Sequence, residues 1–144
     1  MRILDIHEFR ECDRHGCGYF GAPRGNHKHE GVDLVANPGD YVYSPFSGTI
    51  TKHGYCYGDT TKYRYIEITG SKEIVRILYA ELDDAFDIGD KIPQGQFVGI
   101  AQDIAARYPG ITPHVHVEKY KVSDTYRKNP IDPTEDLKKK ELEV

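Results

Sequence analysis

Two histidines stand two positions apart in residues 111–120, ITPHVHVEKY, a segment that otherwise resembles a β-strand. Side chains along a strand alternate between its two faces, so His114 and His116 point the same way. Two neutral imidazole nitrogens aimed at one point are what a zinc site requires. The alternative is a solvent-facing strand with two incidental histidines. Which of the two holds depends on whether further ligands lie elsewhere in the chain.

A second group of ligand-type residues lies upstream, in HKHEGVDL. His29 and Asp33 are four positions apart, and a bend or bulge at Gly31 lets both side chains face one point. Together with His116 they would supply two imidazoles and one carboxylate to a Zn²⁺ ion. Three protein ligands with one open position are typical of catalytic zinc sites, whereas structural sites are closed by four. We therefore predict that His29, Asp33 and His116 bind zinc.

The three cysteines leave two alternatives open. Cys12 and Cys17 lie in the short loop CDRHGCG and are placed to close a small disulfide, while Cys56 has no evident partner. A zinc site formed by Cys12, Cys17 and His15 is the alternative, although this spacing is unusual and the chain has no second cysteine pair. The histidines outside the zinc prediction are expected on the surface: His7, His15, His27 and His53.

Short strand-like runs separated by turn signals predict a mainly β fold, a compact antiparallel domain with one or two short helices. We expect a helical turn in DIAARYPG and a final helix over Thr134–Lys140, capped by Thr134. We expect the strands at these residues: Gly31–Ala36, Tyr41–Ser44, Gly48–Lys52, Lys62–Thr69, Glu73–Leu82, Phe97–Ala101 and the histidine segment.

Length and charge narrow the function classes. The 144 residues fit a single domain, and the net charge of −4 argues against binding driven by nucleic-acid phosphates or by anionic membranes. No apolar run approaches the length needed to span a bilayer, so membrane insertion is not expected. The charged N-terminal residues do not resemble a signal peptide. This leaves an intracellular protein, or a secreted protein in its mature form, which is our prediction.

Several segments together resemble the lysostaphin/LytM-type zinc peptidases: HEGVDL, NPGDYVYSPFSGTI, ILYAELDDAFDIGDKIPQGQFVGIA, HVHVE and NPIDPTEDL. Each segment alone is weak, but their combination over residues 26–137 is specific. The resemblance implies a compact antiparallel β domain with the site in a groove. It also implies that His29, Asp33 and His116 are the metal ligands and that His114 assists catalysis.

CDRHGCG, followed by HEGVD, YSPFSG and YPGITPHVHVE, is similar to the leukocyte cell-derived chemotaxin branch of this fold. That branch is secreted, and the resemblance implies a small disulfide loop, within residues 10–20, closed by Cys12 and Cys17. The other disulfide cysteines of the branch are missing, and Cys56 is extra. The chain is therefore expected to be a divergent member of the branch.

One position departs from the peptidase pattern. Where the family has histidine in Y-A-H-L, this chain has Glu81. An ionised carboxylate cannot donate a hydrogen bond to a developing oxyanion, although it can serve as a general base. Three functions are compatible with this pattern. We favour a non-catalytic zinc-binding domain for extracellular recognition or signalling. The alternatives are a zinc endopeptidase that cleaves peptidoglycan cross-links or glycine-rich peptides with Glu81 and His114, and a metal-free structural relic.

The partners expected for these functions are a cell-surface receptor or a cell-wall peptide or glycan. The eleven tyrosines bear on this expectation. They either cover the rims of the sheet or line a binding groove, because a tyrosine combines an apolar ring with a polar tip.

Overall fold

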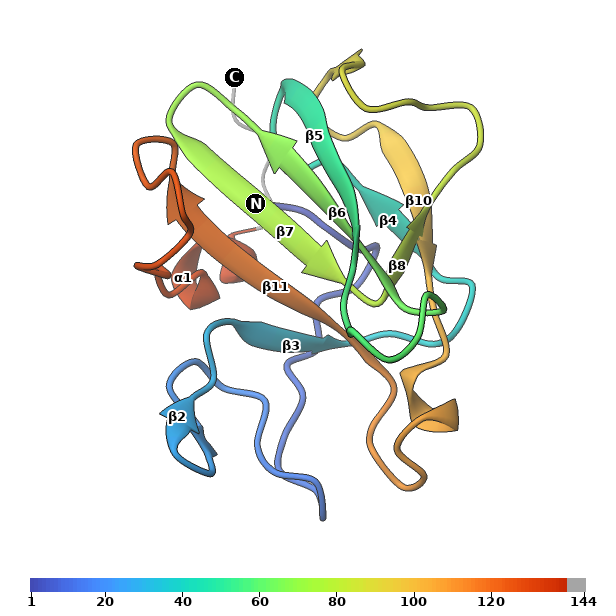
Figure 1. Ribbon diagram of the computed structural model, residues 1–144, viewed down its shortest axis with the longest axis vertical. Coiled ribbons are helices and arrows are strands. Elements are labelled where there is room, and N and C mark those ends of the chain that lie inside the picture. The colour runs from blue at the N-terminus through green and yellow to red at the C-terminus, as the bar shows by residue number, and fades with distance from the viewer. Residues whose placement is uncertain (140–144) are drawn as a thin grey trace.

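The computed structural model describes residues 1–139, which form antiparallel β-sheets and two short helical segments (Figure 1). The strands are β1 (Pro23–Arg24), β2 (His27–Lys28), β3 (Val32–Val35), β4 (Tyr41–Tyr43), β5 (Gly48–Tyr55), β6 (Arg64–Thr69), β7 (Glu73–Leu78), β8 (Ala80–Leu82), β9 (Lys91–Ile92), β10 (Phe97–Ala101) and β11 (His114–Lys121). The helical segments are the 3₁₀ turn η1 (Ile104–Ala106) and α1 (Thr134–Lys138). The predicted fold class is confirmed.

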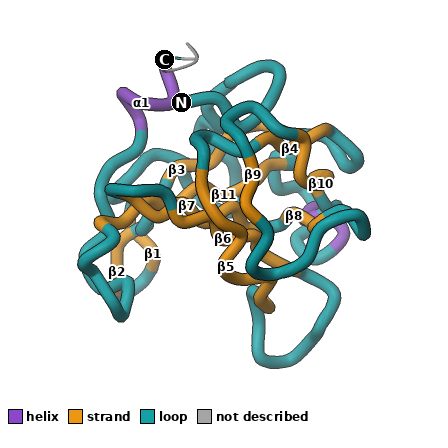
Figure 2. Tube along the Cα trace, turned by 90° about the horizontal axis from the view of Figure 1, so that it is seen from above, coloured by secondary structure: helices purple, strands orange, loops and turns teal. Residues whose placement is uncertain are grey.

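The large sheet has the strand order β3-β11-β7-β6-β5-β9, and a smaller sheet has the order β4-β10-β8. Figures 1 and 2 show the smaller sheet beside β5 and β6. Apolar side chains from both sheets form one buried cluster. Its fully buried members include Ile50, Ile66, Ile77, Val98 and Val117. β-Branched side chains fit the pleated surface of a sheet. The isoleucines and valines of these segments therefore favour the strands that position the site.

The run predicted as one strand over Glu73–Leu82 is broken at Tyr79, which has a φ of 66°. A left-handed backbone is unfavourable for a bulky residue, but the turn is held by hydrogen bonds. The Tyr79 amide donates to the Arg64 carbonyl (2.8 Å), and its carbonyl accepts from the Gln102 amide (2.8 Å). The kink sends β7 into the large sheet and β8 into the smaller one.

The C-terminal helix α1 begins at the predicted Thr134, but Thr134 does not cap it. Pro133 occupies the capping position, and the Asp132 carboxylate accepts a hydrogen bond from the Thr134 amide (2.9 Å). Lys140 lies outside the described residues. Figure 2 shows the N-terminus beside α1, where the Met1 amine donates to the Asp136 carbonyl (2.6 Å). No helix within residues 1–139 has the length and apolarity needed to cross a membrane.

Candidate metal centre

Strand pairing brings the predicted ligands together. In the antiparallel pair β3–β11, Asp33 lies directly opposite His116, so the two side chains share one face. His29 reaches the same point from the segment after β2. Gly31 allows this approach, since a Cβ atom there would lie 2.3 Å from the Val117 carbonyl oxygen and 2.9 Å from the His116 ring. The bend expected at Gly31 therefore rests on a close contact that only glycine permits.

The three ligand atoms form a compact triangle. His29 Nε2 lies 2.9 Å from His116 Nδ1 and 3.2 Å from Asp33 Oδ1, and His116 Nδ1 lies 3.0 Å from the same oxygen. Ligands bound to zinc at about 2.1 Å in tetrahedral geometry are about 3.4 Å apart, so the triangle closely matches one face of a zinc site. Residues 1–139 contain no other group of three such ligands within this reach.

The outer nitrogen of each imidazole is held by a hydrogen bond. His29 Nδ1 lies 3.0 Å from the Tyr19 carbonyl oxygen, to which it donates. His116 Nε2 lies 2.8 Å from the Glu118 carboxylate, which also accepts from the Tyr120 hydroxyl (2.8 Å). Such outer partners fix the ring orientation of metal-binding histidines. Glu118 was not predicted, although it follows His116 by two positions and thus shares its face of the strand.

The cluster is almost closed to solvent, with His29, Asp33 and His116 exposed by 8%, 2% and 7%. Burial alone would raise the pKa of Asp33, but hydrogen bonds with His116 and His29 hold it well below its usual value. Burial also opposes a charge on His116, yet its contacts with Asp33 and Glu118 raise its pKa to about 9.

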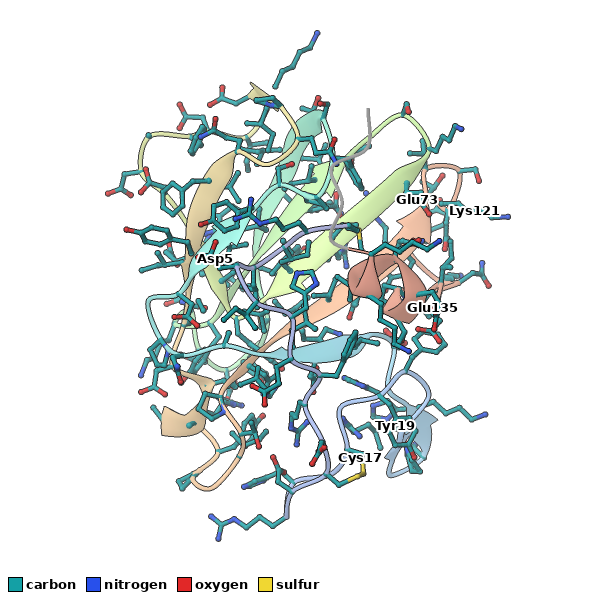
Figure 3. All side chains as sticks on the ribbon, turned by 180° about the vertical axis from the view of Figure 1, so that it is seen from behind. Asp5, Cys17, Tyr19, Glu73, Lys121 and Glu135 are labelled. Carbon is teal, nitrogen blue, oxygen red and sulfur yellow. A yellow bond between two sulfur atoms is a disulfide. The ribbon has the colours of Figure 1, made fainter. Side chains whose placement is uncertain are left out.

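A buried arginine that the sequence did not suggest completes the surroundings of Asp33. Arg10 Nη1 donates to Asp33 Oδ2 (2.8 Å), whereas the nitrogens of His29 and His116 lie beside Oδ1. Arg10 lies two residues before the loop closed by the Cys12–Cys17 disulfide, and Figure 3 labels Cys17, which ends that loop. The disulfide predicted from the resemblance is confirmed. It also rules out the alternative zinc site, because both sulfurs are bonded to each other.

His114 lies beside the triangle without joining it. Its Nδ1 donates to the Thr112 carbonyl (2.7 Å), and its Nε2 lies 3.5 Å from Asp33 Oδ2. Burial lowers its pKa, so the ring is neutral with a lone pair directed into the site. The edge of the Tyr79 ring packs against it, with the ring centroids 5.5 Å apart.

Glu81 lies outside the cluster. Its carboxylate is 3.4 Å from His53 Nε2 and 3.5 Å from Gln102 Nε2, and the side chain is 43% exposed. It is not among the residues that line the cleft over the site. The structure thus brings together His29, Asp33, His116 and His114 but not Glu81. The metal and catalytic roles of these residues stay predictions.

The site forms the floor of a cleft of about 600 Å³. Tyr57, Tyr79 and Tyr108 line it, and their hydroxyls form a chain in which Tyr108 donates to Tyr57 (3.1 Å) and Tyr57 donates to Tyr79 (3.2 Å). Other tyrosines are exposed at the surface, including Tyr41 and Tyr126. Three tyrosines thus line a cleft and others are exposed, while a binding role for the cleft stays a prediction.

A family model described as peptidase family M23 matches residues 27–133, and the chain belongs to this family. It is a divergent LytM-type member near the chemotaxin branch, similar to leukocyte cell-derived chemotaxin-2 of Bos taurus (31% identical over 118 residues, covering 81% of this chain and 76% of that protein).

A further relative is myeloid protein 1 of Gallus gallus, 36% identical over 126 residues that cover 81% of this chain and 36% of the relative. The chain thus spans about a third of that protein. The catalytic domain of the antimicrobial peptidase lysostaphin from Staphylococcus simulans has a similar structure, with a TM-score of 0.68, 22% identity and 92% coverage of both chains. A zinc-containing peptidase from Vibrio cholerae superposes with a TM-score of 0.58 and 19% identity, covering 99% of this chain and 41% of that one. These two likenesses establish the fold.

Proposed function

We propose that the protein binds one zinc ion through His29, Asp33 and His116. The observation that carries this proposal is the triangle of Nε2, Oδ1 and Nδ1 atoms, with sides of 2.9 to 3.2 Å. Two imidazoles and one carboxylate are a donor set that zinc accepts. The structural neighbour from Vibrio cholerae is described as a zinc-containing peptidase, which supports the choice of metal.

The surroundings of the site suit a bound cation. A zinc ion there would provide a Lewis acid and a positive charge at the floor of the cleft. The chain itself keeps the ligands in place: the Tyr19 carbonyl holds His29, Glu118 holds His116, and Arg10 occupies the second oxygen of Asp33. Asp33 is thereby left with one oxygen for a metal.

The domain acts in recognition and does not hydrolyse peptides. Glu81 stands at the position of the peptidase histidine, its carboxylate cannot donate to an oxyanion, and it lies outside the cleft. The cleft with its tyrosines provides a surface for a cell-surface receptor or for a cell-wall peptide or glycan. The Cys12–Cys17 disulfide and the likeness to a chemotaxin support an extracellular location.

Peptidase activity is a second candidate, favoured by His114. This neutral imidazole lies 4% exposed in the cleft wall, with Nε2 directed toward the cluster. Such a group is placed to accept or donate a proton during hydrolysis. The structural neighbour lysostaphin is described as an antimicrobial peptidase. The substrates to examine are those expected from the sequence, glycine-rich peptides and peptidoglycan.

Hydrolysis assays on zinc-loaded protein separate the two functions. Wild-type protein is expected to leave a glycine-rich peptide and purified peptidoglycan intact, as followed by chromatography of the products. Turnover by the wild type that disappears in His114→Ala would establish the peptidase instead. His7→Ala is the matched control, because His7 is a half-buried histidine that does not line the cleft.

A further inference from the structure

The Arg10 side chain links the loop closed by the Cys12–Cys17 disulfide to the candidate metal centre. Arg10 is 4% exposed and donates four hydrogen bonds. Nη1 binds Asp33 Oδ2 (2.8 Å), and Nε and Nη2 bind the two carboxylate oxygens of Asp13 (3.1 and 2.8 Å). Nη2 also binds the Gly16 carbonyl (3.0 Å). The guanidinium is thus fixed on one side by the loop and fixes Asp33 on the other.

The backbone on both sides of the disulfide also forms hydrogen bonds with the Asp33 backbone. The Arg10 amide donates to the Asp33 carbonyl (2.9 Å), and the Asp33 amide donates to the Gly18 carbonyl (2.9 Å). A Cβ atom at Gly18 would lie 2.8 Å from the Arg10 carbonyl oxygen and 3.1 Å from the Asp33 Cβ. There is no free space between the loop and the strand that carries Asp33.

Asp13 connects the disulfide loop to the segment that holds His114. Its carboxylate accepts a hydrogen bond from the Thr112 amide (2.9 Å), and the Thr112 carbonyl accepts from His114 Nδ1. Within the loop, Asp13 and Gly16 exchange two backbone hydrogen bonds of 3.0 Å. The Cys12–Cys17 disulfide closes this turn. Opening it would free Asp13 and Gly16, which are the groups that hold Arg10.

We infer that Arg10 positions Asp33 for zinc and that the Cys12–Cys17 disulfide holds Arg10 in place, so that zinc affinity depends on whether the disulfide is formed. This inference rests on the zinc binding proposed above. A dithiol reductant would transfer two electrons and two protons to the disulfide, yielding two thiols and the oxidised reductant. The reduced protein would then bind zinc more weakly than the oxidised protein.

Two effects of Arg10 on a bound cation oppose each other. Its positive charge repels zinc, but Asp13 pairs with the same guanidinium and offsets that charge. The second effect of Arg10 is to orient the Asp33 carboxylate. Because Arg10 holds Oδ2, Oδ1 is directed at His29 and His116. Removal of such an outer partner typically weakens metal binding by about 10- to 100-fold. We expect orientation to dominate.

Zinc dissociation constants, measured by competition with a chromophoric chelator, test the inference. The proteins compared are the wild type, R10M, the C12S/C17S pair, and R10M combined with that pair. R10M and the serine pair are each expected to weaken zinc binding by about 10- to 100-fold. The combined variant is expected to bind no more weakly than R10M, because both changes act through one side chain.

R127M is the matched control, since Arg127 likewise donates to a buried carboxylate, that of Glu67. It is expected to lower the melting temperature without changing zinc affinity, which separates positioning from a general loss of stability. Far-UV circular dichroism of the metal-free variants reports folding. If R10M does not fold, R10K takes its place, because an ammonium keeps the charge but cannot span Asp13 and Asp33.

A wild type that takes up no zinc would overturn the proposed function and this inference with it. A wild type that binds zinc while R10M, or R10K in its place, binds it equally well would overturn the inference alone. Separate and additive losses from R10M and the serine pair would contradict the coupling between Arg10 and the disulfide.

Discussion

Glu67 and Asp33 have the two most deeply buried carboxylates within residues 1–139, and their partners differ in kind. Glu67 in β6 is fully buried and is bound by Arg76 Nε (2.7 Å), Arg127 Nη2 (2.8 Å) and the Thr51 hydroxyl (2.8 Å). Asp33 in β3 has one oxygen bound by Arg10, while the other faces two imidazole nitrogens. Burial alone would raise the pKa of either carboxyl, and in each case hydrogen bonds lower it, from Arg127 and Arg76 for Glu67 and from His116 and His29 for Asp33.

The two carboxylates differ in whether their partners can give up a proton and bind a metal instead. An arginine keeps its proton under all ordinary conditions, so the Glu67 cluster is closed. An imidazole can lose its proton to a competing metal ion and then offers a lone pair to that metal. Asp33 thus keeps one oxygen for an ion and uses the other for structural support. A buried acid becomes a candidate metal ligand here because of the histidines around it.

The largest effect is expected from Glu67→Gln. The change removes the charge that pairs with Arg76 and Arg127, and a buried pair broken in this way typically costs about 3 kcal/mol of folding free energy. Zinc affinity should not change, because Glu67 belongs to the closed cluster. Urea unfolding and a zinc titration on the same protein measure both quantities. A loss of zinc affinity would show that the two clusters are coupled.

His29→Ala is expected to weaken zinc binding by about 100-fold, since a four-ligand zinc site binds with about 10–16 kcal/mol and each ligand contributes roughly a quarter. Competition with a chromophoric chelator measures the change. His27→Ala is the control, as His27 is an exposed histidine two positions away. Equal losses in the two variants would count against the assignment of His29 as a ligand.

Glu118→Gln is expected to weaken zinc binding by about tenfold, because the neutral amide holds the His116 ring less firmly than the carboxylate does. Glu73→Gln serves as the control. Glu73 pairs with Lys119 (3.0 Å), and Figure 3 shows it at the opposite end of the molecule from Cys17. Unchanged affinity in Glu118→Gln would remove Glu118 from the site.

The smallest expected effect is the pH dependence of the stability that Glu67 contributes. Burial would raise the pKa of Glu67, but its arginine partners lower it below its ordinary value of 4.5. Its contribution to stability is therefore complete above pH 4.5 and is lost as the pH falls through the lower folded-state value. The difference in unfolding free energy between wild type and Glu67→Gln should be constant at neutral pH and should shrink as the pH falls below 4.5. A constant difference would contradict this account of Glu67.

Much of the fold followed from the sequence because the strands carry their own signals. Phe97–Ala101 is predicted and observed with the same bounds, and the histidine strand is observed as β11. The break at Tyr79 was not predicted, because the sequence has no glycine or proline there to signal it. The solvent-facing alternative for the histidine strand is wrong, since β11 is buried from His114 to Tyr120.

The candidate site was predicted as far as ligand types and spacing allow. His29, Asp33 and His116 converge because β3 pairs with β11, which the motif pattern anticipates. Arg10 was not identified, because a lone arginine 23 positions from Asp33 has no motif. Its role depends on a disulfide loop folding over the site. The position of Glu81 also depends on the β7–β8 kink, which side-chain chemistry alone does not reveal.

Elemental analysis of the purified protein tests the central claim most directly. The account predicts one equivalent of zinc per chain in the wild type and a substoichiometric amount in Asp33→Ala, while Glu67→Gln retains the full equivalent. An Asp33→Ala protein that is folded and still carries one zinc per chain would contradict it.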